Sequence, residues 1–161
     1  MDNPVFALSS DERAARMEQL EAILTRAAEE VGDLTEPAIT RFYADSPAAL
    51  EDFRHHAHGK LAQLQATMVE TTLYCIMTWF ERPGEIATIL YGTVPHHTQT
   101  LHVVLPHFVG LLNAVIDAIA DTIPAEEPAE RALIEEIRNS LAVMIEDASK
   151  EWVPAPAQAV A

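Results

Sequence analysis

HTQTLHVVLPHF, residues 97–108, is the stretch of this sequence that says most about the fold. It contains His97, followed by Val103 six residues later and by Phe108 five residues after that, and a long apolar segment comes next. A histidine with a β-branched and an aromatic side chain at these distances can place them against one flat ligand. The rest of the chain then has to supply the opposite wall of such a pocket.

The composition of the chain favours helices. At 161 residues it is long enough for one domain that buries most of its apolar surface without disulfides or structural metals. Hydrophobic residues make up 49% of the chain and only five residues are glycine, while Ala, Leu, Ile and Glu are abundant. This mixture is typical of helix rather than strand. We therefore expect an all-α domain.

Charge and cysteine usage argue against several functions. The formal net charge is −15, from 25 acidic and 10 basic residues, so a nucleic-acid backbone would be repelled and we expect no nucleic-acid partner. No apolar run approaches the ~20 residues that cross a bilayer, and no secretory signal is visible, so we expect no membrane partner. Cys75 is the single cysteine, which fits a reducing compartment. These features predict a soluble, cytoplasmic protein.

The helical spacing of apolar residues, together with the glycines and prolines between these segments, predicts six or seven helices and no strand. Ser9 and Glu12 form a capping-box pattern before the first helix, and Pro106 suits the first turn of a later one. The expected helices cover about residues 10–31, 35–44, 46–53, 60–81, 85–91, 106–123 and 129–152. The expected loops and breaks are residues 54–59, residues 82–84 and the segment from Gly92 to Pro95.

A second spacing occurs upstream, where Pro47 stands six residues before Phe53. Together with the 97–108 stretch it resembles the globin family, in which a proline opens the short third helix and an aromatic six residues later stacks on the haem. A long helix and then a short helix with a histidine follow in both. The resemblance covers about residues 20–152 and implies a globin-like fold of six to eight helices. The domain is expected at residues 1–152, and residues 153–161, with prolines at 154 and 156, are expected to form a disordered tail.

The resemblance implies a haem cofactor with His97 as the ligand of the iron. The second ring nitrogen of this histidine would be held by a backbone carbonyl or a hydroxyl. Thr93, one helical turn earlier, is placed for that role, although Pro95 disturbs the register. His96 is the alternative ligand for the same reason.

The same resemblance assigns the two faces of the haem. Phe53 would stack on the porphyrin from the distal side, and Val103 and Phe108 would fill the proximal side. His102 is expected at an exposed corner, within reach of a haem propionate. We therefore expect these four side chains to meet around one cofactor.

The distal side departs from the familiar oxygen carriers. The position that usually offers a histidine or glutamine falls at Leu64, and Met68 would lie over the iron one turn later. Ile39 falls where related bacterial globins place a tyrosine. The pocket would then be mostly apolar, although a shift by one residue would bring Gln63 or Gln65 inward. A missing donor costs dioxygen a hydrogen bond of about 1–2 kcal/mol and disfavours it against carbon monoxide or nitric oxide.

The remaining histidines and the cysteine are not expected to take part in the pocket. His55, His56 and His58 are expected to be surface residues, since no cysteine or carboxylate ladder accompanies them. One of these three histidines could also reach the iron as a sixth ligand, which the sequence neither supports nor excludes. His107 is expected to be solvated or capping, and Cys75 to be a buried small hydrophobe.

The leading hypothesis is a haem-binding globin that reversibly binds a diatomic gas (O2, NO or CO) for sensing, transport or detoxification. The alternative is a haem-free globin-fold module for regulation or interaction, favoured by the apolar distal wall and the break before His97. A carboxylate-bridged metal bundle is disfavoured, because no histidine pairs with Glu70 or another glutamate on the long helices. A homodimer through the two C-terminal long helices follows only from family analogy.

Overall fold

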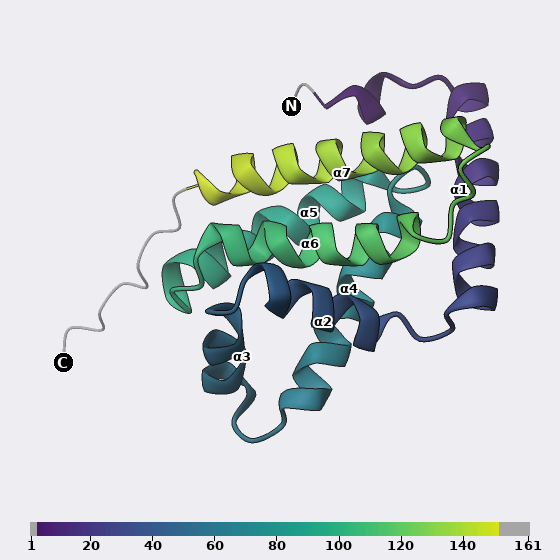
Figure 1. Cartoon of the computed structure of the whole chain (residues 1–161). Helices are drawn as coiled ribbons and strands as arrows, with labels where there is room; N and C mark the ends of the chain where they lie inside the picture. The colour runs from purple at the N-terminus through teal and green to yellow at the C-terminus, as the bar shows by residue number, and fades with distance from the viewer. Residues whose placement is uncertain (1–2, 152–161) are drawn as a thin grey trace.

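The computed structural model describes residues 3–151, and within them it contains seven α-helices and no β-strand. The expectation of an all-α domain is therefore confirmed. The elements, drawn in Figure 1, are the 3-10 turn η1 (Pro4–Ala7), α1 (Ser10–Glu30), α2 (Thr35–Asp45), α3 (Ala49–Ala57), α4 (Leu61–Thr78), α5 (Pro83–Pro95), the π-helical turn η2 (His96–Thr100), α6 (Leu105–Ala120) and α7 (Pro128–Ser149). The tail expected at residues 153–161 lies outside the described residues.

Local side-chain chemistry begins several of these helices. The backbone N–H of Ser9 donates to the Glu12 carboxylate (2.8 Å) and the N–H of Glu12 donates to Ser9 Oγ (3.3 Å), so the predicted capping box opens α1. Pro83, Pro106 and Pro128 lie in the first turns of α5, α6 and α7, where a missing N–H leaves no intrahelical hydrogen bond unmade. These helix starts follow from residues adjacent in the chain.

Helix α3 extends into residues that the sequence indicated as a loop, so that prediction was wrong. The helix continues to Ala57 and ends where His58 and Gly59 adopt φ values of 47° and 82°. This left-handed conformation stops an α-helix. The polar composition of residues 54–59 misled the prediction because α3 buries only a narrow face, which includes Ala49 and Ala57.

The break predicted before His97 was also wrong. Helix α5 begins at Pro83 and continues through Gly92 to Pro95. Ile86 and Leu90, one turn apart on this helix, are both buried. Burial of that face against α7 outweighs the cost of about 1 kcal/mol for a glycine inside a helix.

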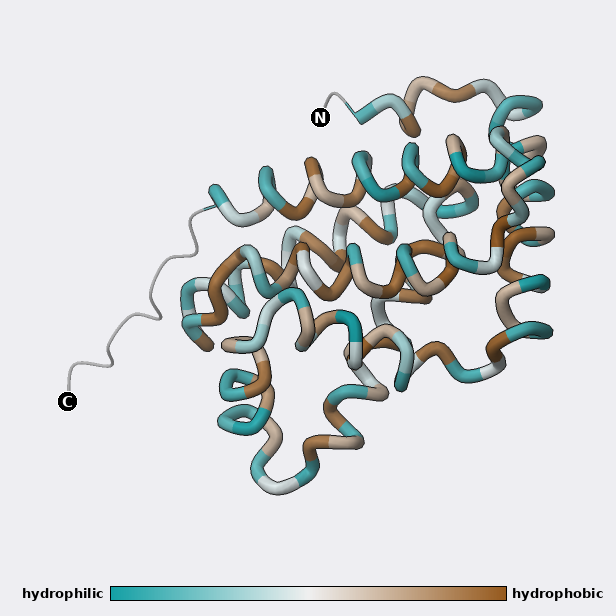
Figure 2. Tube along the Cα trace, viewed as in Figure 1, coloured by the Kyte–Doolittle hydropathy of each residue, from teal (hydrophilic) through white to brown (hydrophobic). Residues whose placement is uncertain are grey.

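The helices pack around one core. Helix α6 contacts α2 and α7, and α5 contacts α7, while α1 crosses the ends of α6 and α7 steeply in Figure 1. Apolar segments face the interior of this arrangement in Figure 2. The largest fully buried side chains include Trp79, Phe42, Phe80, Ile116 and Ile134. The core therefore draws on helices from both halves of the chain.

Helix α6 lies close to α2 at Gly110. A Cβ atom at this position would lie 3.2 Å from Phe42 Cε2 and 3.4 Å from Ser46 Oγ. Phe42 is buried, and its ring centroid lies 5.4 Å from that of Tyr43 and 5.6 Å from that of Phe53. The close crossing thus positions α2 and, through this aromatic cluster, the side chain of Phe53.

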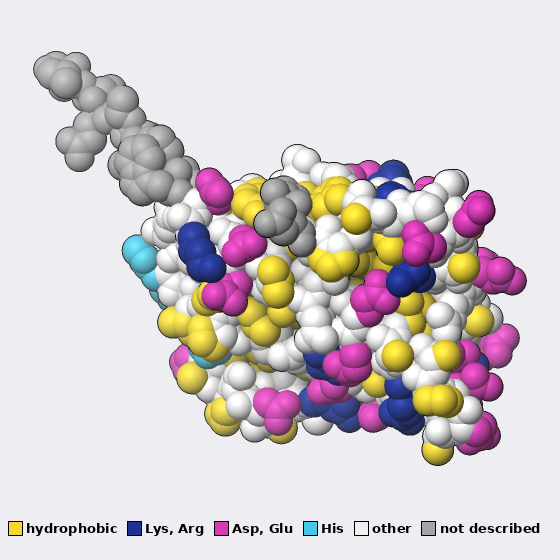
Figure 3. Space-filling view, turned by 90° about the horizontal axis from the view of Figure 1, so that it is seen from above, with side chains coloured by type: hydrophobic (Ala, Val, Ile, Leu, Met, Phe, Trp, Pro, Cys, Tyr) yellow, Lys and Arg dark blue, Asp and Glu magenta, His cyan; other side chains and the backbone are white. Residues whose placement is uncertain are grey.

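The surface carries charges of both signs. Acidic, basic and apolar side chains are intermixed on the face shown in Figure 3. Some charged pairs join helices, with Arg26 of α1 bonded to Glu130 of α7 and Arg138 of α7 bonded to Asp117 of α6. Across the described residues, no helix combines the length and apolarity needed to cross a bilayer.

Candidate functional site

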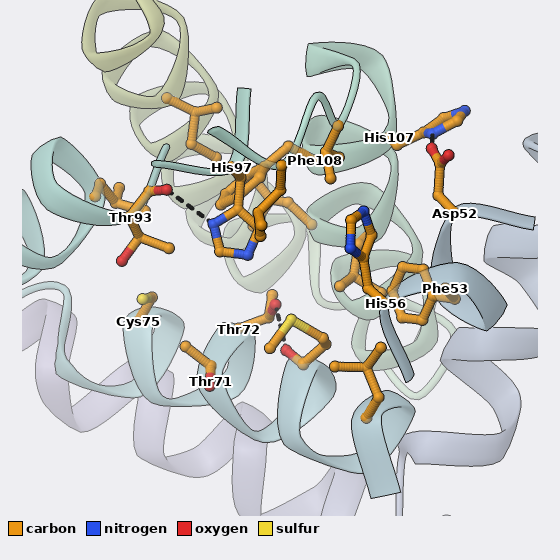
Figure 4. Close-up of a pocket in the computed structure, with 18 of the residues that line it drawn as sticks. Asp52, Phe53, His56, Thr71, Thr72, Cys75, Thr93, His97, His107 and Phe108 are labelled. Carbon is orange, nitrogen blue, oxygen red and sulfur yellow. Dashed lines mark hydrogen bonds and ion pairs between the residues drawn. The ribbon is translucent and has the colours of Figure 1, made fainter. Parts of the chain in front are cut away.

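A cavity of about 350 Å³ lies between α3, α4, the α5–η2 segment, α6 and α7. Its wall is mostly apolar and includes Leu64, Met68, Val103, Leu111 and Ile145. The volume falls within the range of about 300–1,000 Å³ that is usual for pockets holding small organic molecules. Figure 4 shows His97 on one side of this space and Phe53 on another, with side chains of α4 between them.

His97 is held in one orientation at the cavity wall. Its Nδ1 atom lies 2.8 Å from the backbone carbonyl oxygen of Thr93, one turn earlier (Figure 4). Because a carbonyl only accepts, Nδ1 carries the proton and donates it, and in the neutral ring Nε2 keeps a free lone pair. Nε2 has no hydrogen-bond partner among residues 3–151, so the ring presents an unused nitrogen to the cavity.

The π-helical turn η2 brings His97 to this position. The N–H of Leu101 donates to the carbonyl of His96 (3.2 Å), five residues earlier, and the N–H of Val103 donates to the carbonyl of His97 (2.9 Å). These bonds fold the chain back so that Leu101 and Val103 join the cavity wall. The ring of Phe108 then packs edge-on against His97, with centroids 5.5 Å apart. Such π-turns are frequent at functional sites.

Helix α4 closes the cavity with one face. Leu64, Met68 and Thr72, spaced by four residues, all lie in the wall. The Thr72 hydroxyl donates to the Met68 carbonyl (2.9 Å), so its proton is already used. Gln65 instead donates its side-chain amide to the Tyr43 hydroxyl (2.8 Å), and Gln63 lies outside the wall. The register is therefore the one that places Leu64 inward and leaves this wall without a free donor.

The structure brings most of the predicted site residues together. His97, Phe53, Val103 and Phe108 line the cavity, as do Leu64 and Met68. Two predicted residues lie elsewhere. Ile39 belongs to the helix core, because α2 turns this face toward α4 and α6, and His102 is exposed at a corner with φ of 57°. His96, the alternative ligand, is also exposed and outside the wall.

The wall also holds polar groups that were not predicted to lie there. His107 Nδ1 lies 2.7 Å from Asp52 Oδ2, which joins the start of α6 to α3. His56 lies in the wall one turn after Phe53, on the same face of α3 (Figure 4). The spacing of three residues is a sequence signal for a shared face, but it applies only if residues 54–57 are helical. The Asp52–His107 contact has no local sequence signal, because the two residues are 55 positions apart.

Cys75 lines the inner part of the cavity and behaves as an apolar residue. It is buried, as expected from the sequence, and burial raises the pKa of its thiol to about 11. At neutral pH the side chain is therefore a neutral thiol and a weak nucleophile or metal ligand. It contributes an apolar surface to the cavity.

The ligand set limits which metal can be held here. Among the described residues, no group of three or more His, Cys, Asp or Glu side chains is arranged to bind a metal ion. A metal on His97 would thus need most of its ligands from a cofactor. A haem fits these residues, since it needs one neutral imidazole nitrogen and flat apolar walls around the porphyrin. The free Nε2 of His97 and the apolar wall meet both requirements.

The chain was also compared with known proteins. No family model, no curated protein and no solved structure gave a match. The functional assignment therefore depends on the geometry of the cavity and on the sequence resemblance carried by its residues.

Proposed function

We propose that this chain is a globin-like haem protein that reversibly binds a diatomic gas. The observation that carries the proposal is the contact between His97 Nδ1 and the Thr93 carbonyl (2.8 Å). It leaves Nε2 as a lone-pair donor at the wall of an apolar cavity. Haem-ligating histidines are commonly oriented in this way through their second nitrogen.

The order of the elements around the cavity supports the globin-like part of the proposal. Pro47 and Phe53 precede a long helix, α4, and the histidine comes from the α5–η2 segment that follows. Phe53 and His97 line the same cavity although they are far apart in the chain. This order is the one that the resemblance implies, with α4 on the distal side and α5 on the proximal side.

The haem would supply an iron with a coordination position for the gas. The protein chain would contribute the ligand of the iron and the apolar surroundings of the haem. His97, held in one tautomer by the Thr93 carbonyl, would bind the iron, and the leucine, valine and phenylalanine side chains of the wall would exclude water. Leu64 and Met68 offer no hydrogen-bond donor, so α4 adds nothing that would favour dioxygen over carbon monoxide.

The alternative function is that of a haem-free regulatory or interaction module. Of the two observations that favoured it, the break before His97 is not found. The expected disruption before His97 is absent, since α5 is continuous to Pro95 and passes directly into η2. The apolar distal wall remains, but an apolar wall is equally what a haem requires.

Titration with haemin, followed by absorbance, tests the proposal. Wild type is expected to give a sharp Soret band that saturates near one haem per chain. His97→Ala should lose or alter this band, whereas His96→Ala should keep it, because His96 is exposed and outside the wall. A wild type that shows only the broad absorbance of free haemin would refute the proposal. So would a His97→Ala spectrum identical to wild type.

A further inference from the structure

We propose that His56 is a second axial ligand at this site, supplied by α3 from the side of the cavity opposite His97. The inference rests on the proposed haem site and adds its regulation. The iron would be held between two imidazoles of the chain, and a gas would have to displace His56 before it binds.

The first support is the position of His56. It lines the same cavity as His97, but it comes from the last turn of α3 rather than from α4. Figure 4 shows its ring beside Phe53, across the cavity from His97. The position that usually carries a polar distal residue holds Leu64. The polar side chain on this side is thus provided by another helix.

The second support is that the imidazole of His56 is unpartnered. No hydrogen bond or ion pair joins it to any residue in the described range, and its ring contact is with His55, at 5.0 Å between centroids. The side chain is half-buried in an apolar wall. Its ring nitrogens are therefore not engaged by other side chains or backbone groups of residues 3–151, and a neutral imidazole is the commonest protein ligand of transition metals.

The other polar groups of the cavity are less suited to the role. Figure 4 shows the ring of His107 turned toward Asp52, which lies 2.7 Å from its Nδ1, and away from His97, and His58 is exposed in a left-handed conformation. The Met68 thioether is the one rival on α4, since a methionine can also ligate haem iron. The unpartnered nitrogen of His56 favours it over the thioether, which loses little by packing in an apolar wall.

His56 lies close to the C-terminal end of α3. His56 lies two residues before His58 and Gly59, whose φ values of 47° and 82° end the helix, and α4 begins at Leu61. Release of the imidazole requires a rotation of the His56 side chain or a movement of the nine-residue helix α3. If His56 occupies the iron about nine-tenths of the time, the apparent dissociation constant for a gas rises about tenfold.

The experiment uses the full chain loaded with haemin, with ferric and dithionite-reduced spectra and electron paramagnetic resonance of the ferric form. Wild type should be six-coordinate and low-spin. His56→Leu and the milder His56→Gln should become high-spin, free imidazole should restore the low-spin signature, and carbon monoxide should bind about tenfold more tightly. His55→Leu is the matched control, because His55 is the exposed neighbour outside the wall, and it should resemble wild type.

The outcomes separate this inference from the proposed function. A wild type that binds haem through His97 but is already five-coordinate overturns the inference and leaves the haem site standing. A low-spin signal that survives His56→Leu and His56→Gln but is lost in Met68→Leu also overturns it, in favour of the thioether. A wild type that binds no haem refutes both.

Discussion

Alanine substitution at Gly110 tests whether the α2–α6 crossing is as tight as the structure shows. The new Cβ would lie 3.2 Å from Phe42 Cε2, closer than ordinary van der Waals contact, and 3.4 Å from Ser46 Oγ. Phe42 has little freedom to retreat, because it is buried and packed against the ring of Phe53. Overpacking of this kind costs about 1–3 kcal/mol, against a gain of about 1 kcal/mol for alanine over glycine in a helix.

Gly92 is the matched control. It also lies inside a helix, but it is exposed, and a Cβ there meets no atom within 4 Å. We expect Gly92→Ala to raise the free energy of unfolding by about 0.5–1 kcal/mol and Gly110→Ala to leave it unchanged or lower it by up to about 2 kcal/mol. The difference between the two variants isolates the packing cost of the crossing.

Urea denaturation followed by circular dichroism measures both free energies, provided that the slope with denaturant is unchanged. Haem affinity gives a second readout, since a displaced Phe42 shifts Phe53 at the cavity wall. Gly110→Ala should weaken haemin binding, and Gly92→Ala should not. If Gly110→Ala stabilised the protein as much as Gly92→Ala, the argument for a tight crossing would be refuted.

Three further changes have defined outcomes. Ser9→Ala removes the side-chain cap of α1 and should lower the free energy of unfolding by about 0.5–2 kcal/mol in denaturation experiments; no change would contradict the role of the capping box. The Arg26 guanidinium holds the pKa of Glu130 below its usual value, so the stabilisation from this pair is complete at neutral pH and is lost as pH falls through the acidic range. Glu130→Gln should therefore flatten the acid side of the stability–pH curve, and an unchanged curve would argue against the pair. Cys75 should react slowly with a thiol reagent at pH 8 until the protein unfolds, because burial raises its pKa to about 11; rapid labelling of the native protein would contradict its burial.

The elements that depend on neighbours in the chain were predicted well. The capping box of Ser9 and Glu12 and the proline at the start of α6 appear where the sequence places them. The errors occur where packing opposes composition. Polar residues 54–57 are helical because one face of α3 is buried, and α5 passes through Gly92 because Leu90 and its neighbours pack against α7.

In the candidate site, too, local contacts were predictable from the sequence and packing between helices was not. The spacing of Thr93 and His97 is one helical turn, so their contact was foreseeable from the sequence. The position of Ile39 in the core was not foreseeable, because it depends on how α2 is rotated about its own axis. His56 was missed for a related reason, since its direction follows from the extension of α3.

The sequence by itself determined the all-α class, most helix starts and the histidine with its backbone partner, because these depend on contacts within one or two turns. Only the tertiary structure decided which side chains share the cavity. Phe53, Met68 and His97 meet there because three helices pack at particular rotations and crossings. The pairing of Asp52 with His107 over 55 residues arises in the same way. Such contacts depend on the sum of many weak packing interactions, and no local pattern encodes that sum.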